Sequence, residues 1–258
     1  GQIQKELKRW LHFRVELGLG MRKKSKSNDV VLRANDMKYD NGASYSGAIK
    51  DVFDTRPHGH GTYFYADHLE DGVGDHYYSG NFKNSQFHGY GKYISKEYNY
   101  KGEFKNQKFH GQGEYSSKEH YYKGEFKNDK PHGTVEEIFF EKDTVYIGQF
   151  KNGLRHGYGI TKSYKNKKNK SNFKGQWKNG LMSEGIFDYG DGGIYSGQFK
   201  NSEMHGKGVL TESRGKKAGQ VYSGNWKNGN MNGIFIFKDK TGKKRKELWR
   251  EDKFIKFI

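Results

Sequence analysis

The stretch YKGEFKNQKFHGQGEY at Tyr100–Tyr115 decides the fold, because almost the same letters return at once as YKGEFKNDKPHGTVEE at Tyr122–Glu137. Each copy begins with an aromatic residue, any residue and a glycine, and this glycine recurs at positions 47, 80, 102, 124, 148, 175, 197 and 224. A base spacing of about 22 residues is typical of a tandem repeat array. Eight such units cover most of residues 40–238.

Each unit predicts a β-hairpin. Tyr78, Gly80 and Phe82 alternate with Ser79 and Asn81, which is the period of a strand with one buried face. The letters KNSQF then predict a turn, and a second alternating strand follows. Because a glycine on a buried face leaves space, we expect the aromatic rings of one hairpin to lie over glycines of its neighbours.

The residues expected to carry this packing share the first, third and fifth positions of a unit. They are Tyr78, Gly80, Phe82, Tyr100, Gly102, Phe104, Tyr122, Gly124, Phe126, Tyr146, Gly148, Phe150, Tyr195, Gly197, Phe199, Tyr222, Gly224 and Trp226. Hydrophobic residues make up only 32% of the chain and aromatic residues 16%, so aromatic rings must supply most of the burial. The composition therefore predicts a thin, aromatic fold.

The repeats YIGQFKNGLRHGYG, residues 146–159, and YSGQFKNSEMHGKG, residues 195–208, resemble the MORN repeat family. The resemblance implies an all-β fold, an elongated, twisted antiparallel sheet of tandem hairpins. The sixth unit, with GLMSEGIF, lacks the His-Gly pair of the motif, and the eighth has Asn232 in place of its histidine. Insertions lengthen the first and fifth units.

The two ends differ from the repeats. Residues 1–38 predict a basic N-terminal amphipathic helix followed by a linker, with Leu7, Trp10 and Leu11 as a candidate surface for a membrane or a partner. Residues 39–238 hold the eight repeats. Residues 239–258 predict a degenerate hairpin that caps the array, because the ends of such arrays must cover an open sheet edge.

No pattern of catalytic residues stands out. The chain has no cysteine, which excludes disulfides and thiolate sites and favours an intracellular location. Phosphate loops, nucleophile elbows and the HExxH motif are absent from the sequence. The recurring histidines belong to strands whose equivalent positions lie too far apart for one metal ion, so we expect them to be structural. No enzyme activity, metal or cofactor is predicted.

Charge indicates the kind of partner. The net charge of +17 favours anionic surfaces. A lysine precedes asparagine at the same turn position of seven units, which predicts a ladder of exposed lysines along one sheet edge. The denser clusters are candidate patches for an anionic partner: Lys165, Lys167, Lys168 and Lys170, and Lys243, Lys244, Arg245 and Lys246.

The leading hypothesis is a non-enzymatic scaffold that binds other protein subunits in a large assembly. The family resemblance implies a cilium or axoneme, with radial-spoke-like structures foremost, or the cytoskeleton. One alternative is a peripheral module that tethers the protein to anionic phospholipids. Another is an accessory subunit of an organellar complex or ribonucleoprotein. Nucleic acid ranks last as a partner, because the aromatic residues alternate with glycine as in a core.

Overall fold

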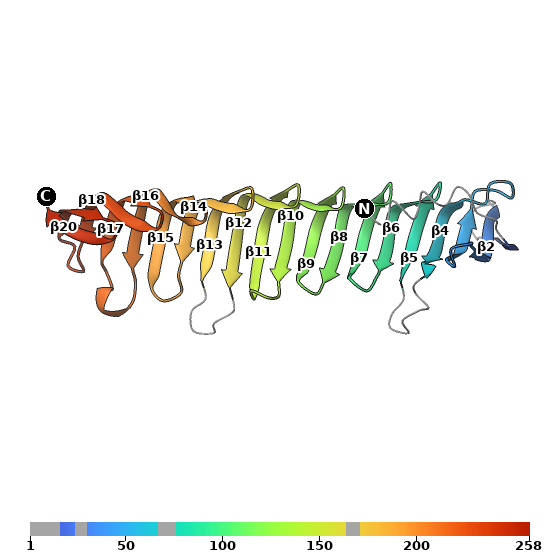
Figure 1. Cartoon of the computed structure of the whole chain (residues 1–258), viewed down its shortest axis with the longest axis horizontal. Coiled ribbons are helices and arrows are strands. Elements are labelled where there is room, and N and C mark those ends of the chain that lie inside the picture. Colours follow the sequence, from blue (N-terminus) through green and yellow to red (C-terminus); the bar gives the residue numbers. More distant parts are fainter. Residues whose placement is uncertain (1–15, 24–29, 67–75, 164–170) are drawn as a thin grey trace. The chain divides into compact units, whose positions relative to one another are not determined.

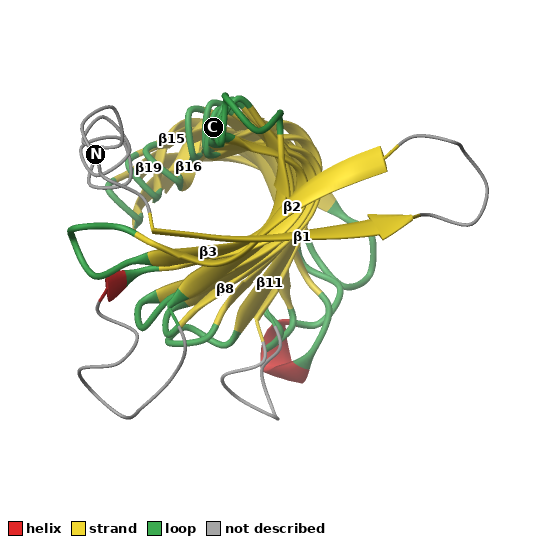
Figure 2. Ribbon diagram, turned by 90° about the vertical axis from the view of Figure 1, so that its right-hand side faces the viewer, coloured by secondary structure: helices red, strands yellow, loops and turns green. Residues whose placement is uncertain are grey.

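The computed structural model describes residues 16–23, 30–66, 76–163 and 171–258. These residues form twenty strands and include a 3₁₀ turn at Gly215–Lys217, and the strand pairs with a defined register are antiparallel. Figure 2 shows strands joined by loops with very little helix. The expected all-β fold of antiparallel hairpins is therefore confirmed.

The chain divides into two compact units. Unit 1 comprises residues 1–118 and 126–129, and unit 2 comprises residues 119–125 and 130–258. Within each unit, consecutive hairpins follow one another in chain order (Figure 1).

The strands of unit 1 are β1 Glu16–Lys23, β2 Val30–Lys38, β3 Ser44–Ile49, β4 Pro57–Phe64, β5 Tyr77–Lys83, β6 Gln86–Ile94, β7 Tyr98–Lys105 and β8 Lys108–Ser117. Strand β9, His120–Lys127, is divided between the units. The strands of unit 2 are β10 Lys130–Phe139, β11 Thr144–Lys151, β12 Leu154–Ser163, β13 Asn172–Lys178, β14 Leu181–Asp188, β15 Gly193–Lys200, β16 Glu203–Glu212, β17 Val221–Lys227, β18 Asn230–Lys238, β19 Lys244–Arg250 and β20 Lys253–Phe257.

The N-terminal region corrects part of the sequence prediction. Residues 1–15, which include Leu7, Trp10 and Leu11, lie outside the described residues. Glu16 and Leu17, expected at the end of a helix, instead begin β1. The expected linker contains β2, which pairs with both β1 and β3. Backbone pairing with the first repeat therefore extends the sheet into a segment with no repeat motif.

The hairpin turns explain the asparagine in each Lys-Asn motif. Asn84 and Ser85 both have positive φ, at 49° and 65°, and Asn106 and Gln107 repeat this conformation at 51° and 66°. Two left-handed residues in succession define a type I′ turn, whose twist matches that of the flanking strands. Asparagine tolerates this region better than most residues.

In the repeats that pair two glycines across the strands, the tyrosine lies over both glycines of its own hairpin. A methyl group added to Gly91 would stand 2.5 Å from the hydroxyl of Tyr78, and one added to Gly80 would stand 2.6 Å from it. The hydroxyl donates a hydrogen bond to the carbonyl of Asn81 at 2.8 Å. We expected rings to lie over glycines of neighbouring hairpins, and this expectation was wrong. The two glycines under Tyr78 pair across the strands of the hairpin to which Tyr78 itself belongs.

Aromatic contacts then join neighbouring hairpins. The ring of Tyr78 stacks on Phe87 of its own hairpin at 3.7 Å and meets the edge of Phe104 from the next at 5.1 Å. Offset or edge-to-face ring pairs of this kind stabilise the fold beyond the contribution of their buried area. The fifth-position rings are all buried: Phe82, Phe104, Phe126, Phe150, Phe199 and Trp226. We call this side of the sheet the aromatic face and the other the solvent face.

Side chains on the solvent face also support the hairpin geometry. The side-chain oxygen of Gln149 accepts a hydrogen bond from the backbone N–H of Tyr158 at 3.2 Å, and that of Gln198 accepts one from Lys207 at 3.1 Å. Glu103 does the same for Gln112. These bonds satisfy amides at register shifts within the hairpins, where the ladder leaves them unpaired.

Candidate functional site

The fourth repeat departs from the tyrosine-over-glycine arrangement. Val135 stands where most other hairpins carry their second glycine, as Gly113 does in the third. Its side chain is buried against the sheet and occupies the place of a tyrosine ring. The hydroxyl of Tyr122 donates a hydrogen bond to Oε1 of Glu137 at 3.0 Å.

Glu137 is the centre of a polar cluster on the aromatic face of unit 2. Only 6% of this residue is exposed, and Nε of Arg155 donates a hydrogen bond to its Oε2 at 2.9 Å. Nδ1 of His120 lies 3.3 Å from its Oε1. A buried carboxylate is tolerated when it is paired and hydrogen-bonded in this way.

Arg155 takes the place of the phenylalanine that stacks on the repeat tyrosine in earlier hairpins. Its guanidinium lies 4.7 Å from the ring centroid of Tyr146 and 5.2 Å from that of Trp177. A planar cation over an aromatic face is a favourable substitute for a stacked ring. Burial raises the pKa of Tyr146 to about 12, and the nearby Arg155 opposes this shift.

An open hollow of about 460 Å³ surrounds the cluster. Its floor is aromatic and apolar, with Phe139, Phe150, Trp177, Met182 and Phe187, and its polar groups include those of His120, Glu137 and Arg155. We call it the β10–β14 hollow. A mostly apolar hollow with a few fixed polar groups is suited to binding a segment of another molecule.

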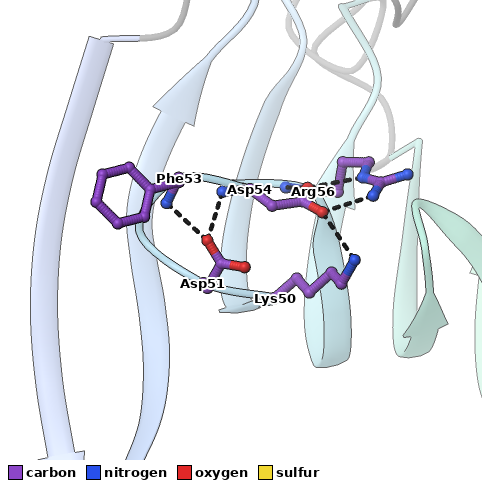
Figure 3. Close-up of polar contacts among 5 residues, drawn as sticks. All are labelled: Lys50, Asp51, Phe53, Asp54 and Arg56. Carbon is purple, nitrogen blue, oxygen red and sulfur yellow. Dashed lines mark hydrogen bonds and ion pairs between the residues drawn. The ribbon is translucent and has the colours of Figure 1, made fainter.

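A second feature is the loop between β3 and β4 in unit 1. Phe53 at its tip is 98% exposed. Figure 3 shows that Oδ1 of Asp51 accepts hydrogen bonds from the backbone N–H groups of Phe53 and Asp54, each at 2.7 Å. Asp54 in turn pairs with Arg56 at 2.5 Å and with Lys50 at 3.1 Å. The loop thus presents an aromatic ring on a tip held by its own polar residues.

The predicted basic patches are placed differently from one another. Lys165, Lys167, Lys168 and Lys170 lie outside the described residues. Lys243 is exposed before β19, and Lys244 and Lys246 are exposed on that strand. Arg245 points to the aromatic face, where it bonds to Oε1 of Glu247 at 2.6 Å and lies 4.1 Å from the ring of Phe237. The C-terminal run is therefore split between two faces.

The lysine ladder lies where the sequence places it. The last residue of each first strand is an exposed lysine in β5, β7, β9, β11, β13, β15 and β17: Lys83, Lys105, Lys127, Lys151, Lys178, Lys200 and Lys227. These side chains adjoin the hairpin turns.

The histidines form no metal site within the described residues, where no group of three or more potential ligands gathers. Nδ1 of His88, His110, His132 and His156 is buried without a hydrogen-bond partner, whereas Nδ1 of His205 accepts a weak bond from the N–H of Asn228 at 3.5 Å. In the same part of the chain, no helix is long and apolar enough to cross a membrane.

The sequence prediction missed the polar cluster. Aligning the repeats column by column would have revealed it, since Val135 replaces the glycine of most units, and Glu137 and Arg155 are charged residues in columns that are otherwise uncharged. The sequence gives only a weak indication that Phe53 is exposed: seven residues connect β3 and β4, whereas the other repeat hairpins turn in two residues.

Hairpins of one motif, most of them packed by an aromatic ring over paired glycines, define a tandem β-hairpin repeat protein. The MORN repeat profile matches residues 52–70, 78–99, 100–119, 122–134, 146–166, 173–194, 195–211 and 222–234. These eight segments cover more than half of the chain, which belongs to the MORN repeat family. No curated protein matches the chain. MORN repeats generally act as modules that bind proteins or membranes, and the family is not typically enzymatic.

Proposed function

We propose that this protein is a non-enzymatic scaffold whose β10–β14 hollow binds a segment of a partner protein within a large assembly. The observation that carries the proposal is the pairing of buried Glu137 with Arg155 on an apolar, aromatic floor. The array does not need this pair, because other hairpins hold a phenylalanine or methionine at the position of Arg155 and fold in the same way.

The hollow suits an extended segment or a helix. Aromatic and aliphatic floor residues receive apolar side chains, while the Glu137–Arg155 pair and His120 supply directional polar contacts. Such a division between apolar contact and a few fixed polar groups is typical of peptide recognition. The assembly we propose is the axoneme, with a radial-spoke-like structure foremost, or the cytoskeleton, as the resemblance of the repeats to their family implies.

A pair of substitutions tests this proposal without opening the core. Arg155→Met introduces the residue found at the equivalent positions 182, 204 and 231, and Glu137→Thr introduces the residue found at position 161. The double variant therefore has only residues that other repeats carry at these positions, and it removes both members of the buried Glu137–Arg155 pair at once. Tyr90→Thr, on the solvent face of unit 1, serves as the control.

The experiment is native affinity purification of the full chain, followed by mass spectrometry. We expect axonemal or cytoskeletal proteins to be recovered with the wild type and with Tyr90→Thr, and to be lost with the double variant. Recovery of the same proteins with all three would exclude the hollow as the docking site. Recovery of the chain without protein partners would contradict the scaffold itself.

The exposed loop of unit 1 favours a second candidate function, attachment to an anionic membrane. The ring of Phe53 stands at the tip, and the lysines of the neighbouring turns, Lys83 and Lys105, lie along the same sheet edge. An apolar side chain that inserts into the interface and basic residues worth about 1 kcal/mol each are the usual components of such binding. Flotation with vesicles of phosphatidylcholine and phosphatidylserine tests it: Phe53→Ser should reduce binding, and neutral vesicles should not bind.

A further inference from the structure

The solvent face carries a row of residues that changes character between the two units. The row is formed by the residue before the glycine in each first strand and the residue after the glycine in each second strand. In unit 1 it is polar, with Thr62 paired to Ser79, Ser79 to Lys92, and Lys92 to Lys101. In unit 2 the same repeat position is aliphatic in five strands: Ile147, Ile160, Ile186, Val209 and Ile236.

Strand register makes these five residues part of one continuous line. Ile147 pairs with Ile160, which pairs with Lys174 of the next strand, and Lys174 pairs with Ile186. Ser196 and Ser223 connect the line through Val209 to Ile236, and Ile236 pairs with Lys246. We call the five apolar residues the aliphatic row.

Three residues of the aliphatic row are exposed, and Ile160 and Val209 are half-buried. Ile147 is 53% exposed, Ile186 is 48% and Ile236 is 47%. Isoleucine and valine favour strands, but the polar row of unit 1 forms equally regular strands without them. The row therefore exceeds what the fold requires, and a line of exposed apolar side chains on a soluble sheet indicates a docking surface.

A hollow of about 530 Å³ lies over the C-terminal half of the row. Val209, Ile234 and Ile236 supply its apolar part, and Lys207 and Lys246 stand among its lining residues. No carboxylate lines it. Within the described part of the chain, neither lysine has a carboxylate oxygen within 4 Å, and the same holds for Lys174 in the row.

The spacing of the row matches an α-helix laid across the strands. Neighbouring strands lie about 4.8 Å apart, so Ile186, Val209 and Ile236, on alternate strands, repeat every 9.6 Å or so. Seven residues of an α-helix rise about 10.5 Å, close to this repeat. The seven strand steps from Ile147 to Ile236 span roughly 34 Å, which a helix covers in about 22 residues.

We propose that the aliphatic row and its hollow on the solvent face of unit 2 bind an acidic amphipathic helix of a partner protein. One apolar side chain per heptad of the helix lies on the row, and its carboxylates meet Lys174, Lys207 and Lys246. This surface lies on the face opposite the β10–β14 hollow, so the scaffold would hold two different segments at once. The experiment that tests this surface is independent of the one that tests the β10–β14 hollow.

The probe is a synthetic helix of about 22 residues with leucine at heptad spacing and glutamate on the flanking positions, stapled because short isolated helices are marginal in water. A scrambled peptide of the same composition and staples is its control. Binding to the full chain is followed by fluorescence anisotropy. The test variant is Ile186→Thr/Ile236→Thr, because threonine keeps the β-branched shape and strand preference. The control variant is Tyr90→Thr, which removes a side chain 55% exposed on the solvent face of unit 1.

The wild type and Tyr90→Thr should bind the helix equally, and added salt should weaken both. The double threonine variant should bind about tenfold more weakly, with an unchanged thermal midpoint. Undetectable binding to the wild type, equal binding of the scrambled peptide, or unchanged affinity of the double variant would overturn the proposal. A different pair of results would also overturn it: the wild type binds phosphatidylserine vesicles but not the peptide, and the double threonine variant loses the vesicle binding. The surface would then bind a membrane.

Discussion

Gly91→Ala should destabilise unit 1 strongly, although it adds only one methyl group. The new carbon would stand 2.5 to 2.7 Å from three atoms of the Tyr78 ring, well inside van der Waals contact. Tyr78 has no exposed surface, stacks on Phe87 at 3.7 Å and donates its hydroxyl proton to the carbonyl of Asn81. The ring has no free space into which it can move.

The magnitude follows from what the displaced ring would lose. Overpacking a well-packed site costs typically about 1–3 kcal/mol, and loss of the Tyr78 hydrogen bond adds about 1 kcal/mol. The stacked contact with Phe87 contributes about 0.5–1.5 kcal/mol more when it is broken. We therefore expect a loss of roughly 3 kcal/mol. In a Tyr78→Ala background the same substitution should cost much less, because the obstructing ring is gone.

Urea unfolding followed by circular dichroism measures the total effect, and amide hydrogen exchange locates it, since repeat arrays need not unfold in one step. Protection should fall in β5 and β6 and remain in β15 and β16. Gly193→Ala is the matched control, because its added carbon would meet its nearest neighbour, Tyr189, at an ordinary 3.4 Å. Equal unfolding curves for Gly91→Ala and Gly193→Ala would refute the role of the glycine pair.

Three further predictions concern unit 2. Val135→Gly should release Tyr122 from Glu137 and let the ring of Tyr122 cover the new glycine pair. The free energy of unfolding should change by only about 1 kcal/mol, while the ring signals of Tyr122 shift in NMR spectra. Unchanged ring signals would contradict this account. Arg155→Met alone should cost about 3 kcal/mol in urea unfolding because it removes the arginine that neutralises a buried carboxylate, and Glu137→Thr should rescue most of that loss. Because burial raises the pKa of Tyr146 to about 12 while the unfolded chain titrates near 10, the stability this residue gives is complete below pH 10 and declines as the pH rises towards 12. Alkaline unfolding should therefore be less steep in Tyr146→Phe, and an identical pH profile would count against the assignment.

Much of the fold could be read from single residues of the repeat. The alternation of Tyr78, Gly80 and Phe82 predicts a half-buried strand, and the asparagine of each turn predicts a left-handed conformation, because both depend on local geometry. What lies over each glycine could not be read in this way, since it depends on which strands pair. The sequence pattern allowed a ring from a neighbour, whereas cross-strand pairing selects Tyr78 itself.

The candidate sites were less predictable for a related reason. A run of basic letters suggests one patch, but consecutive strand residues point to opposite faces, so Arg245 joins the aromatic side and Lys246 the solvent side. The polar cluster was missed because it depends on strand order and register: Glu137 of β10 meets Arg155 of β12 across the intervening strand β11. β2 has no repeat motif and is held by backbone pairing, which leaves little trace in side-chain pattern.

The turns within hairpins and the connections between hairpins differ in how freely their length varies. Most turns within hairpins have two residues and are hydrogen-bonded to the hairpin before, as when the N–H of Ser85 donates to the carbonyl of Pro57 and that of Gln107 to the carbonyl of Phe87; among the repeat hairpins, the β3–β4 loop is the exception in length. The connections between hairpins carry no such constraint: β4 and β5 pair in full register although twelve residues separate Phe64 from Tyr77. New sequence can thus enter between repeats without disturbing the ladder, which makes these connections the place where such an array can acquire new loops, and where a fluorescent or affinity tag can be inserted within the chain.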